Sequence, residues 1–303
     1  MKTRFLIFVL MLAGFSSWAQ QDSQYTMYMY NTININPAYA GSRGVMSLFG
    51  LHRSQWVGMD GAPVTNAASL NSPIGESNLG IGLSFVNDRI GPTTENQFSA
   101  DISYTIRTDE FHKLSFGIKG TANMFGLDRG KLTPEEQNDP SLQAVRNDFS
   151  PNIGAGVYWH TDKYYIGLSV PNFIENNNWA ENDRAINKER MNYYLIGGYV
   201  FDLNPMWKLK PAVLTKAITG APLQVDVSLN TLYDDRFMLG AAYRWDAAAS
   251  LMAGFQISQG LFIGYGYDME TTRLRQYNSG SHEVFLRYEF FSNKNKIISP
   301  RFF

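Results

Sequence analysis

Short segments in which apolar and polar residues alternate follow one another from residue 44 to residue 291. The stretch 223–230 shows the pattern most clearly, with apolar side chains at Leu223, Val225, Val227 and Leu229 and polar ones at Gln224, Asp226, Ser228 and Asn230. A period of two places the apolar side chains on one face of a β-strand and the polar side chains on the other. The pattern predicts an all-β chain of about 14 antiparallel strands.

The expected strands cover residues 45–56, 64–72, 79–85, 98–106, 114–118, 153–159, 164–170, 191–201 and 207–213, followed by five centred on Val227, Ala241, Phe255, Tyr265 and Leu286. The first two strands alternate less clearly than the others. Pro211 lies inside one expected strand, although proline lacks the N–H that a strand ladder needs and usually occupies an edge, a strand start or a bulge.

The connections between the expected strands differ in length on the two sides of the sheet. Those after even-numbered strands are tight turns, whereas several after odd-numbered strands are long, at 127–149, 172–188 and 270–280. Short turns on one rim and long loops on the other are typical of bacterial outer-membrane β-barrels, whose short turns face the periplasm. An even number of strands returns both ends of such a barrel to the periplasmic side.

Tryptophans fall where the expected strands reach the two rims. Trp56 and Trp245 lie at the outer rim and Trp159 and Trp207 at the inner rim, as interfacial aromatic girdles require. Periodicity alone does not identify the solvent on the apolar face, so a soluble sandwich or propeller is the structural alternative. No repeat of blade length is visible in the sequence, which disfavours the propeller.

Composition agrees with a sheet in lipid. Aromatic residues make up 14% of the chain, and charged residues only 17%, below the roughly 25% of soluble domains. The sequence contains no cysteine, which excludes disulfides and thiolate metal sites. After the first residues, no apolar run is long enough for a spanning helix. A membrane protein without such a helix spans the bilayer as a closed barrel, so we expect a transmembrane β-barrel in the outer membrane.

The first nineteen residues resemble a secretory signal peptide. Lys2 and Arg4 precede an apolar run, and small residues at Ser17 and Ala19 precede Gln20. Cleavage there removes two positive charges from a chain of net charge −1, so the mature net charge of −3 gives no pull toward nucleic acid. We therefore expect a signal peptide at 1–19, an N-terminal segment at 20–44, the barrel at 45–291 and a periplasmic tail at 292–303.

The N-terminal segment has two interpretations. Tyr25, Met29 and Ile33 are spaced at helical intervals and Pro37 would end a helix, so we expect a short helix and a turn. The run from Asn36 to Gly41 is either a docking or plug element at the inner rim or a turn that leads the chain into the first strand. Asn-Pro and glycine are typical of turns, which favours the second interpretation.

The C-terminal run Ser299-Pro300-Arg301-Phe302-Phe303 is either a solvated tail or a periplasmic contact for a partner. Two aromatic side chains at a free end are unfavourable in water, which favours the contact. Together the two ends supply seven candidate partner-binding residues, which are Asn36, Pro37, Tyr39, Gly41, Arg301, Phe302 and Phe303.

These ends, together with Arg53-Ser54-Gln55-Trp56, resemble the PorP/SprF family of type IX secretion and gliding motility. The resemblance implies a non-enzymatic outer-membrane protein that helps to export or retain a large secreted surface protein, such as an adhesin. It also implies three kinds of partner: a secreted client with a C-terminal sorting domain, type IX secretion components including periplasmic or outer-membrane lipoproteins, and outer-membrane lipid.

The sequence offers little sign of catalysis, metal binding or cofactor binding. Its four histidines lie on different strands, and none has a second histidine three or four residues away. Glycine pairs at 80/82, 154/156 and 264/266 lack the context of dinucleotide binding and indicate places where a strand bends or a neighbouring chain packs closely. We therefore expect no catalytic residue, no cofactor and no metal.

Charged residues are expected to point into the barrel at Asp101, Arg107, Lys119, Asp226, Arg244, Asp246, Glu283, Arg287 and Glu289. Unpaired, they would tune ion selectivity. Paired, they would form a polar core or hold an inserted segment. Fourteen strands enclose less space than a 16-stranded porin and more than a packed 8-stranded barrel, so a plug from 20–44 or 127–149 would fit. We expect an occluded lumen.

Three functions follow from these observations. The first is a secretion-associated barrel that anchors a client, and the second is a diffusion channel for small solutes. The third is an outer-membrane enzyme with a catalytic set at one rim that includes His52 or His282. The end motifs favour the first.

Overall fold

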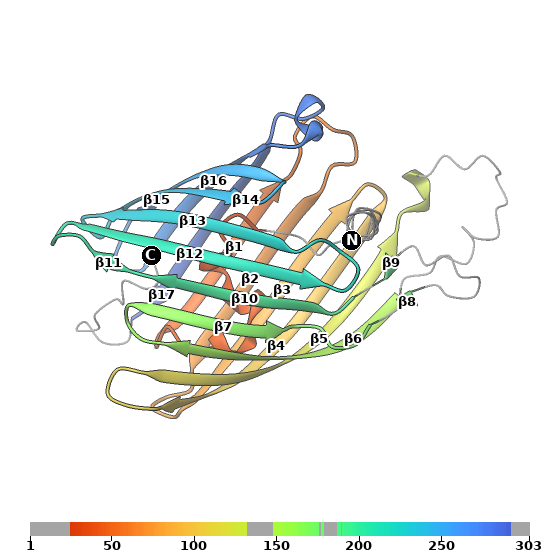
Figure 1. The fold of residues 1–303 in the computed structure, drawn as a ribbon. Coiled ribbons are helices and arrows are strands. Elements are labelled where there is room, and N and C mark those ends of the chain that lie inside the picture. The colour runs from red at the N-terminus through yellow and green to blue at the C-terminus, as the bar shows by residue number, and fades with distance from the viewer. Residues whose placement is uncertain (1–24, 132–147, 176, 179–186, 189, 292–303) are drawn as a thin grey trace, which may run out of the picture.

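The protein is a closed antiparallel β-barrel (Figure 1). The computed structural model describes residues 25–131, 148–175, 177–178, 187–188 and 190–291. Within these residues, fourteen strands pair with their neighbours in chain order, and pairing of β1 with β17 and of β10 with β12 completes the ring. The expected fold class and strand number are therefore confirmed.

The wall is formed by β1 (Met46–Ser54), β2 (Val64–Pro73), β3 (Leu79–Ile90), β4 (Thr93–Arg107), β5 (Lys113–Leu127), β6 (Asp148–His160), β7 (Tyr164–Val170), β10 (Asn192–Tyr199), β12 (Trp207–Ile218), β13 (Gln224–Tyr233), β14 (Phe237–Arg244), β15 (Ala248–Gln256), β16 (Leu261–Glu270) and β17 (Ser281–Phe290). Short β11 (Phe201–Asp202) extends β10, and β8 (Asn177–Asn178) pairs with β9 (Asn187–Lys188) between β7 and β10.

The two rims differ as expected. The inner rim carries only short turns, at 74–78, 108–112, 161–163, 203–206, 234–236 and 257–260. The outer rim carries the long connections 128–147, 171–191 and 271–280. Met46 pairs with Phe290, so the barrel wall begins and ends at the inner rim. No helix in the described residues has the length and apolar character to span a membrane.

Apolar and polar side chains alternate between the two faces of the wall. On β4, Ile102 is 52% exposed on the outer face, whereas its neighbours Asp101 and Ser103 are each 1% exposed in the interior. Leu83 on β3 and Ile118 on β5 continue the exposed apolar face, at 58% and 63%. The exposed apolar band is the surface that meets lipid.

The weak alternation of β1 has a structural cause. Its outward residues Met46 and Leu48 are exposed, but its inward residues Phe49 and Leu51 are apolar too and are buried inside the barrel. They belong to an apolar cluster that the N-terminal segment completes. Because β1 meets apolar surroundings on both faces, its sequence loses the simple alternation.

Strands β3 to β6 extend farther toward the outer rim than the alternation predicts. The strands were expected to reach residues 85, 98, 118 and 153 at this rim, and the observed strands are longer. β3 and β5 run to Ile90 and Leu127, and β4 and β6 begin at Thr93 and Asp148. Beyond the lipid-facing band the outward positions become polar, with Asn66, Asn87 and Asn96 side by side on β2, β3 and β4. Strand pairing continues there without the apolar signal.

The tryptophans lie at the predicted rims of the barrel, and Pro211 lies inside a strand as expected. Trp159 and Trp207 lie at the inner rim, and Trp245 is 71% exposed at the outer rim. Trp56 also lies at the outer rim, but its indole N–H donates to Glu270 Oε1 at 2.7 Å. Pro211 interrupts the ladder between β12 and the β10–β11 strand. On the other edge of that strand, Val200 donates to the Lys163 carbonyl at 2.7 Å.

Candidate functional site: the segment inside the barrel

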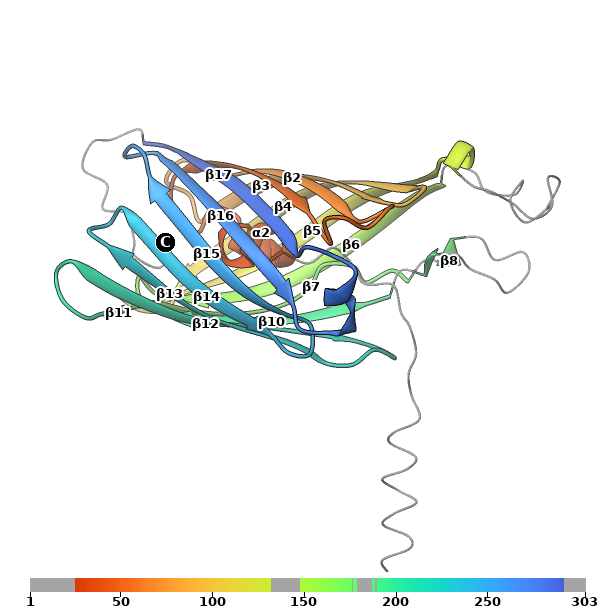
Figure 2. The same ribbon diagram turned by 90° about the horizontal axis from the view of Figure 1, so that it is seen from above.

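The N-terminal segment lies within the ring of strands. It contains η1 (Tyr28–Tyr30), α2 (Thr32–Ile35) and η2 (Pro37–Tyr39), and Figure 2 shows α2 surrounded by the wall. Residues 25–40 are buried, except for half-buried Asn34. This segment therefore fills part of the lumen, in addition to leading the chain into β1.

The segment crosses the lumen from one half to the other. Thr26 contacts Glu283, near the outer end of β17, whereas Arg43 forms an ion pair with Glu289 near its inner end. The barrel wall begins and ends at the inner rim. The N-terminal segment starts in the outer half of the lumen, at Thr26, and runs through the lumen to reach β1 at the inner rim.

A cluster of charges holds the outer end of the segment. This charged wall consists of Arg53 on β1, Asp268 on β16 and Glu283 on β17. Arg53 Nη2 lies 2.7 Å from Asp268 Oδ2, and Arg53 Nη1 lies 3.0 Å from Glu283 Oε2. Glu283 accepts hydrogen bonds from the backbone N–H groups of Thr26 and Met27, each at 2.9 Å.

The Thr26 hydroxyl joins the same network. It donates to Asp268 at 2.6 Å and accepts from Arg53 Nη1 at 2.9 Å. All three charged side chains are at most 2% exposed. A buried ion pair is stable only when its charges are paired and their remaining hydrogen-bonding capacity is satisfied. Here the N-terminal segment takes part in four hydrogen bonds to these charges, which links its position to the charged wall.

The opposite side of the segment packs against glycine. This glycine wall consists of Gly80 and Gly82 on β3, Gly117 on β5 and Gly156 on β6. A β-carbon on any of them would lie under 3.0 Å from the segment, at Ala40 O, Ile33 Cδ1, Ala38 N and Asn36 Oδ1 respectively. Side chains at these positions would occupy the space of the segment, so the close approach predicted for Gly80, Gly82 and Gly156 is present.

Polar side chains of the wall satisfy the carbonyl groups that α2 and η2 leave open. Lys119 Nζ donates to the carbonyls of Ile33 and Asn34, at 3.1 and 3.2 Å. The Ser169 hydroxyl donates to Ile35 O at 2.8 Å, and the Ser103 hydroxyl donates to Ala40 O at 2.7 Å. The last carbonyls of a helix need such partners, and here the wall of the barrel supplies them.

Asn36 combines a turn with an anchor. Its Oδ1 accepts from the Ala38 N–H at 2.9 Å, while its Nδ2 donates to Val157 O on β6 at 3.0 Å. Pro37 occupies the first position of η2, where its missing N–H costs nothing. The turn interpretation and the plug interpretation of this run therefore describe one structure.

Comparison with known proteins places the chain in a family. The profile of the type IX secretion system membrane protein PorP/SprF matches residues 17–288. The chain belongs to the PorP/SprF family. It is an outer-membrane β-barrel of type IX secretion and not an enzyme, as the sequence predicts. No curated protein sequence matches the chain.

The comparison with solved structures finds several to which this PorP/SprF chain is similar at TM-scores under 0.5. Omp33 of Acinetobacter baumannii is 6% identical with a TM-score of 0.49, covering 81% of this chain and 99% of its own. The toluene transporter TbuX of Ralstonia pickettii is 8% identical with a TM-score of 0.48, covering 85% and 92%. The CymD monoaromatic hydrocarbon channel is 13% identical with a TM-score of 0.47, covering 86% and 93%.

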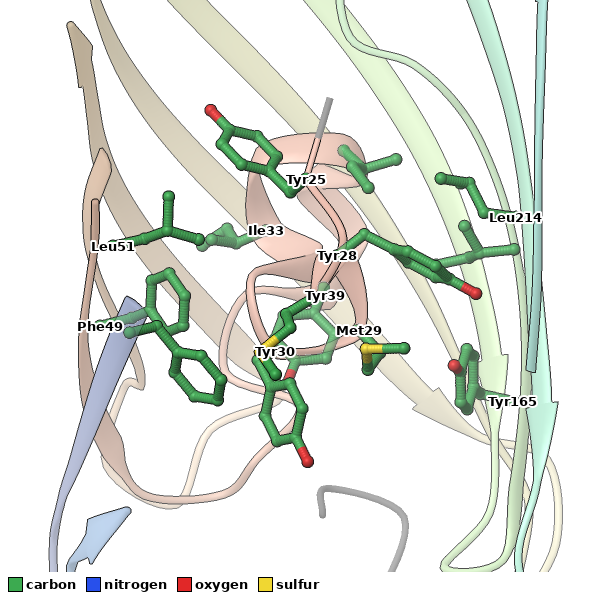
Figure 3. Close-up of a cluster of buried hydrophobic side chains, with 14 of the residues drawn as sticks. Tyr25, Tyr28, Met29, Tyr30, Ile33, Tyr39, Phe49, Leu51, Tyr165 and Leu214 are labelled. Carbon is green, nitrogen blue, oxygen red and sulfur yellow. The ribbon is translucent and has the colours of Figure 1, made fainter. Parts of the chain in front are cut away.

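Aromatic side chains fill the space between the two walls of the PorP/SprF barrel (Figure 3). The Tyr30 ring lies 4.6 Å from that of Phe285 and 5.5 Å from that of Phe262, and Phe49 lies 5.4 Å from Phe285, measured between centroids. Such offset and tilted pairs add to the stability that burial provides. Burial raises the pKa of the Tyr30 phenol above its ordinary value.

The candidate partner-binding residues divide into two groups. Asn36, Pro37 and Tyr39 are buried inside the barrel, and Gly41 lies where the segment passes Gly80 and Pro73 with a φ of 71°. Arg301, Phe302 and Phe303 lie outside the described residues. Contact of either group with a partner protein stays a prediction.

Most of the charges expected inside the barrel are there. Buried or half-buried positions facing the lumen are occupied by Asp101, Lys119, Asp226, Arg244, Glu283, Arg287 and Glu289. Arg107 and Asp246 are instead exposed, because one ends β4 at the inner rim and the other lies in the turn between β14 and β15.

The sequence alone does not predict several of the charged residues inside the barrel. Arg53 stands in a run that suggests the family, but its partner Asp268 is 215 positions away. Arg43 and Lys210 are likewise buried in the lumen. Their positions depend on which strands become neighbours and on the strand register, and the sequence gives neither for residues so far apart.

The histidines considered for catalysis lie on the neighbouring strands β1 and β17, where each contacts a different partner. His52 Nδ1 lies 2.8 Å from Asn66 Oδ1, and His282 Nδ1 lies 2.6 Å from the Tyr265 hydroxyl, both on the outer face of the wall. Among the described residues, no three His, Asp or Glu side chains are grouped so that they could hold a metal ion.

Proposed function

We propose that this PorP/SprF barrel holds a secreted surface protein, an adhesin-type client with a C-terminal sorting domain, at its outer rim during or after type IX export. In this role the barrel is an anchor and the client does not pass through its lumen. The inner rim, with its short turns, faces the periplasmic and lipoprotein components of the secretion system.

The observation that carries the proposal is the segment fixed across the lumen. It is held by buried ion pairs on one wall and by close packing against glycine on the other. Displacing it would remove the hydrogen bonds that the segment makes to Arg53, Asp268 and Glu283. Loss of hydrogen bonds to buried charges destabilises a protein. A barrel with a fixed internal segment is suited to binding at its ends.

The outer end offers more surface for a client than the inner end. Strands β3 to β6 project beyond the lipid-facing band, and the connection 271–280 contains η4 (Arg273–Gln276) with exposed Leu274 and Tyr277. Arg273 and Arg275 add positive charge to the same connection. Protein interfaces favour aromatic residues and arginine, so this connection is a suitable contact for the client.

The proposal is tested by shortening the connection 271–280 to a tight turn and measuring the client on intact cells by immunolabelling. We expect the client to leave the cell surface and to accumulate in the medium. A matched control replaces the inner-rim turn residues 234–236 with another tight turn and should retain the client. Full retention after the 271–280 change, with the barrel present at normal levels, would contradict the proposal.

A diffusion channel is the second candidate, because charges of both signs line the lumen. The two functions differ in planar lipid bilayers, where a diffusion channel conducts ions without any change to the protein. Conductance of the purified barrel at porin-like levels, with no client bound in mild detergent, would select the channel.

A further inference from the structure

A groove crosses the lipid-facing surface of β1, β17, β16 and β15. Its volume is about 600 Å³, within the range of roughly 300–1,000 Å³ that ligand sites occupy. The apolar side chains of Phe255, Ile263, Val284 and Leu286 line it. Because the groove is continuous with the exposed apolar band, the occupant that its surroundings supply is a lipid acyl chain.

The floor of the groove is formed by small residues that point outward. They include Gly50 on β1 and Ala253 on β15. Within 4 Å, a β-carbon on Gly50 would meet only the Leu286 side chain, at 3.9 Å. This is ordinary van der Waals contact, so a larger side chain at Gly50 would fill the groove without displacing the wall of the barrel.

A row of hydrogen-bonded polar side chains begins at the outer end of the groove. This polar row consists of His52 on β1, Asn66 on β2, Asn87 on β3 and Asn96 on β4. His52, which also lines the groove, has its Nδ1 2.8 Å from Asn66 Oδ1. Asn66 Nδ2 donates to Asn87 Oδ1 at 3.4 Å, and Asn87 Nδ2 donates to Asn96 Oδ1 at 2.8 Å. The groove and the polar row therefore form one continuous surface.

The polar row has hydrogen-bonding capacity left for a ligand. A primary amide has two N–H donors. Among the described residues, Asn66 and Asn87 each use one of them within the row, and the side chain of Asn96 donates none. The row spans three strand spacings, or about 14 Å, which is longer than the headgroup of an ordinary phospholipid. A headgroup built of sugars supplies acceptor oxygens over that length.

An exposed cation lies next to the polar row. Arg89 is the next outward residue after Asn87 on β3, toward the outer rim. Its side chain forms no hydrogen bond or ion pair with any residue that the structure describes. The outward residues beside it, Val64 and Thr94, carry no charge. A cation at the edge of a membrane attracts lipid phosphate, and Arg89 is placed for this contact.

We propose that this face binds a phosphorylated glycolipid of the outer leaflet, of the lipid A class. An acyl chain lies in the groove over Gly50, the sugar and acyl-linkage oxygens accept hydrogen bonds from the polar row, and a phosphate lies at Arg89. The order of these groups in the lipid, from apolar chain to polar linkage to anion, matches their order along the face. The site is distinct from the general contact that any barrel makes with lipid, and it is independent of client retention.

Native mass spectrometry of the full-length barrel in mild detergent, with diphosphorylated lipid A added, tests the proposal. We expect lipid A to bind more tightly than phosphatidylethanolamine. Gly50→Leu should weaken the binding of lipid A by about tenfold, because filling the groove removes the burial of an acyl chain. The matched control is Gly120→Leu, since Gly120 is an outward glycine on β5 that lies outside the groove. It should leave the binding unchanged.

The contact with phosphate is tested at Arg89. Arg89→Gln should weaken the binding of diphosphorylated lipid A by about tenfold, as expected for the loss of a hydrogen bond to a charged group. It should leave the binding of dephosphorylated lipid A unchanged. Arg107→Gln is the matched control, because Arg107 is exposed at the inner rim, and it should leave the binding of both lipids unchanged. Inorganic phosphate should not displace the lipid, since the acyl chain holds it in the groove.

Equal affinity for lipid A and phosphatidylethanolamine would overturn the proposal, because the face would then make only the general contact of a barrel with its bilayer. Equal effects of Gly50→Leu and Gly120→Leu, or of Arg89→Gln and Arg107→Gln, would remove the lipid from the groove or its phosphate from Arg89. Displacement by inorganic phosphate would reduce the ligand to an anion. A barrel that purifies as a dimer, and that Gly50→Leu makes monomeric, would assign the face to a second copy of the chain. Heat-dependent mobility on gels shows for each variant that the barrel is folded.

Discussion

The N-terminal segment is held by different means on the two sides of the lumen. On β1, β16 and β17, the charged wall binds Thr26 and Met27 through hydrogen bonds to buried charges. On β3, β5 and β6, the glycine wall contributes space. The backbone of the segment lies against Gly80 and Gly117, and the side chains of Ile33 and Asn36 lie against Gly82 and Gly156.

This difference predicts opposite sensitivities to mutation. The charged wall should be sensitive to loss of a group, because a remaining buried charge has no compensating partner. The glycine wall should be sensitive to gain of a group, because an added side chain has no room. Substitutions of each kind therefore test whether the segment is held as the structure describes.

The largest effect is expected from Arg53→Met, which removes the cation shared by Asp268 and Glu283. Breaking a buried ion pair by removing one partner destabilises proteins by about 3–5 kcal/mol. Urea unfolding in lipid vesicles, followed by tryptophan fluorescence, measures the change. The matched control is Lys163→Met, which breaks an exposed ion pair with Asp202 and should have little effect. Equal effects of the two variants would show that the charged wall has no special role.

Gly117→Val should displace the segment from the glycine wall. Overpacking costs about 1–3 kcal/mol, and here the obstacle is the backbone of Pro37 and Ala38, which cannot rotate away. The matched control on the same strand is Gly120→Val, since a β-carbon on Gly120 meets nothing within 4 Å. Protease cleavage within residues 25–40 should rise in the first variant alone. Similar cleavage in both would contradict the close approach at Gly117.

Asn36→Ala should have a smaller effect, of about 1–2 kcal/mol, because it removes the cap of η2 and one hydrogen bond to Val157. Asn34→Ala is the control, since the Asn34 side chain has no hydrogen-bond partner among the described residues. The same unfolding measurement compares them. Equal stability of the two variants would contradict the anchoring role of Asn36.

The repeated alternation of the sequence predicts the barrel because it reports the solvent on each face of each strand. It fails where that solvent changes. β1 faces lipid on one side and the apolar segment on the other, so Phe49 and Leu51 obscure its period. β3 and β4 leave the lipid at Asn87 and Asn96 while pairing continues. In both places the alternation of apolar and polar residues follows the environment of each face, and it stops before the strand does.

The interior of the site is predictable only in part. Asn36-Pro37 predicts a turn, and paired lumen glycines predict close packing, because both signals are local. The grouping of Arg53, Asp268 and Glu283 is not local, since β1 meets β17 only when the barrel closes. Closure and register, and not residue type, decide which charges become neighbours.

Ion conductance in planar lipid bilayers tests most directly the central proposal, that the N-terminal segment held across the lumen keeps ions from passing through it. The intact barrel should show no porin-like conductance, whereas a barrel without residues 25–40, shown to be folded by its heat-dependent mobility, should conduct. Equal conductance of the two proteins would contradict the claim.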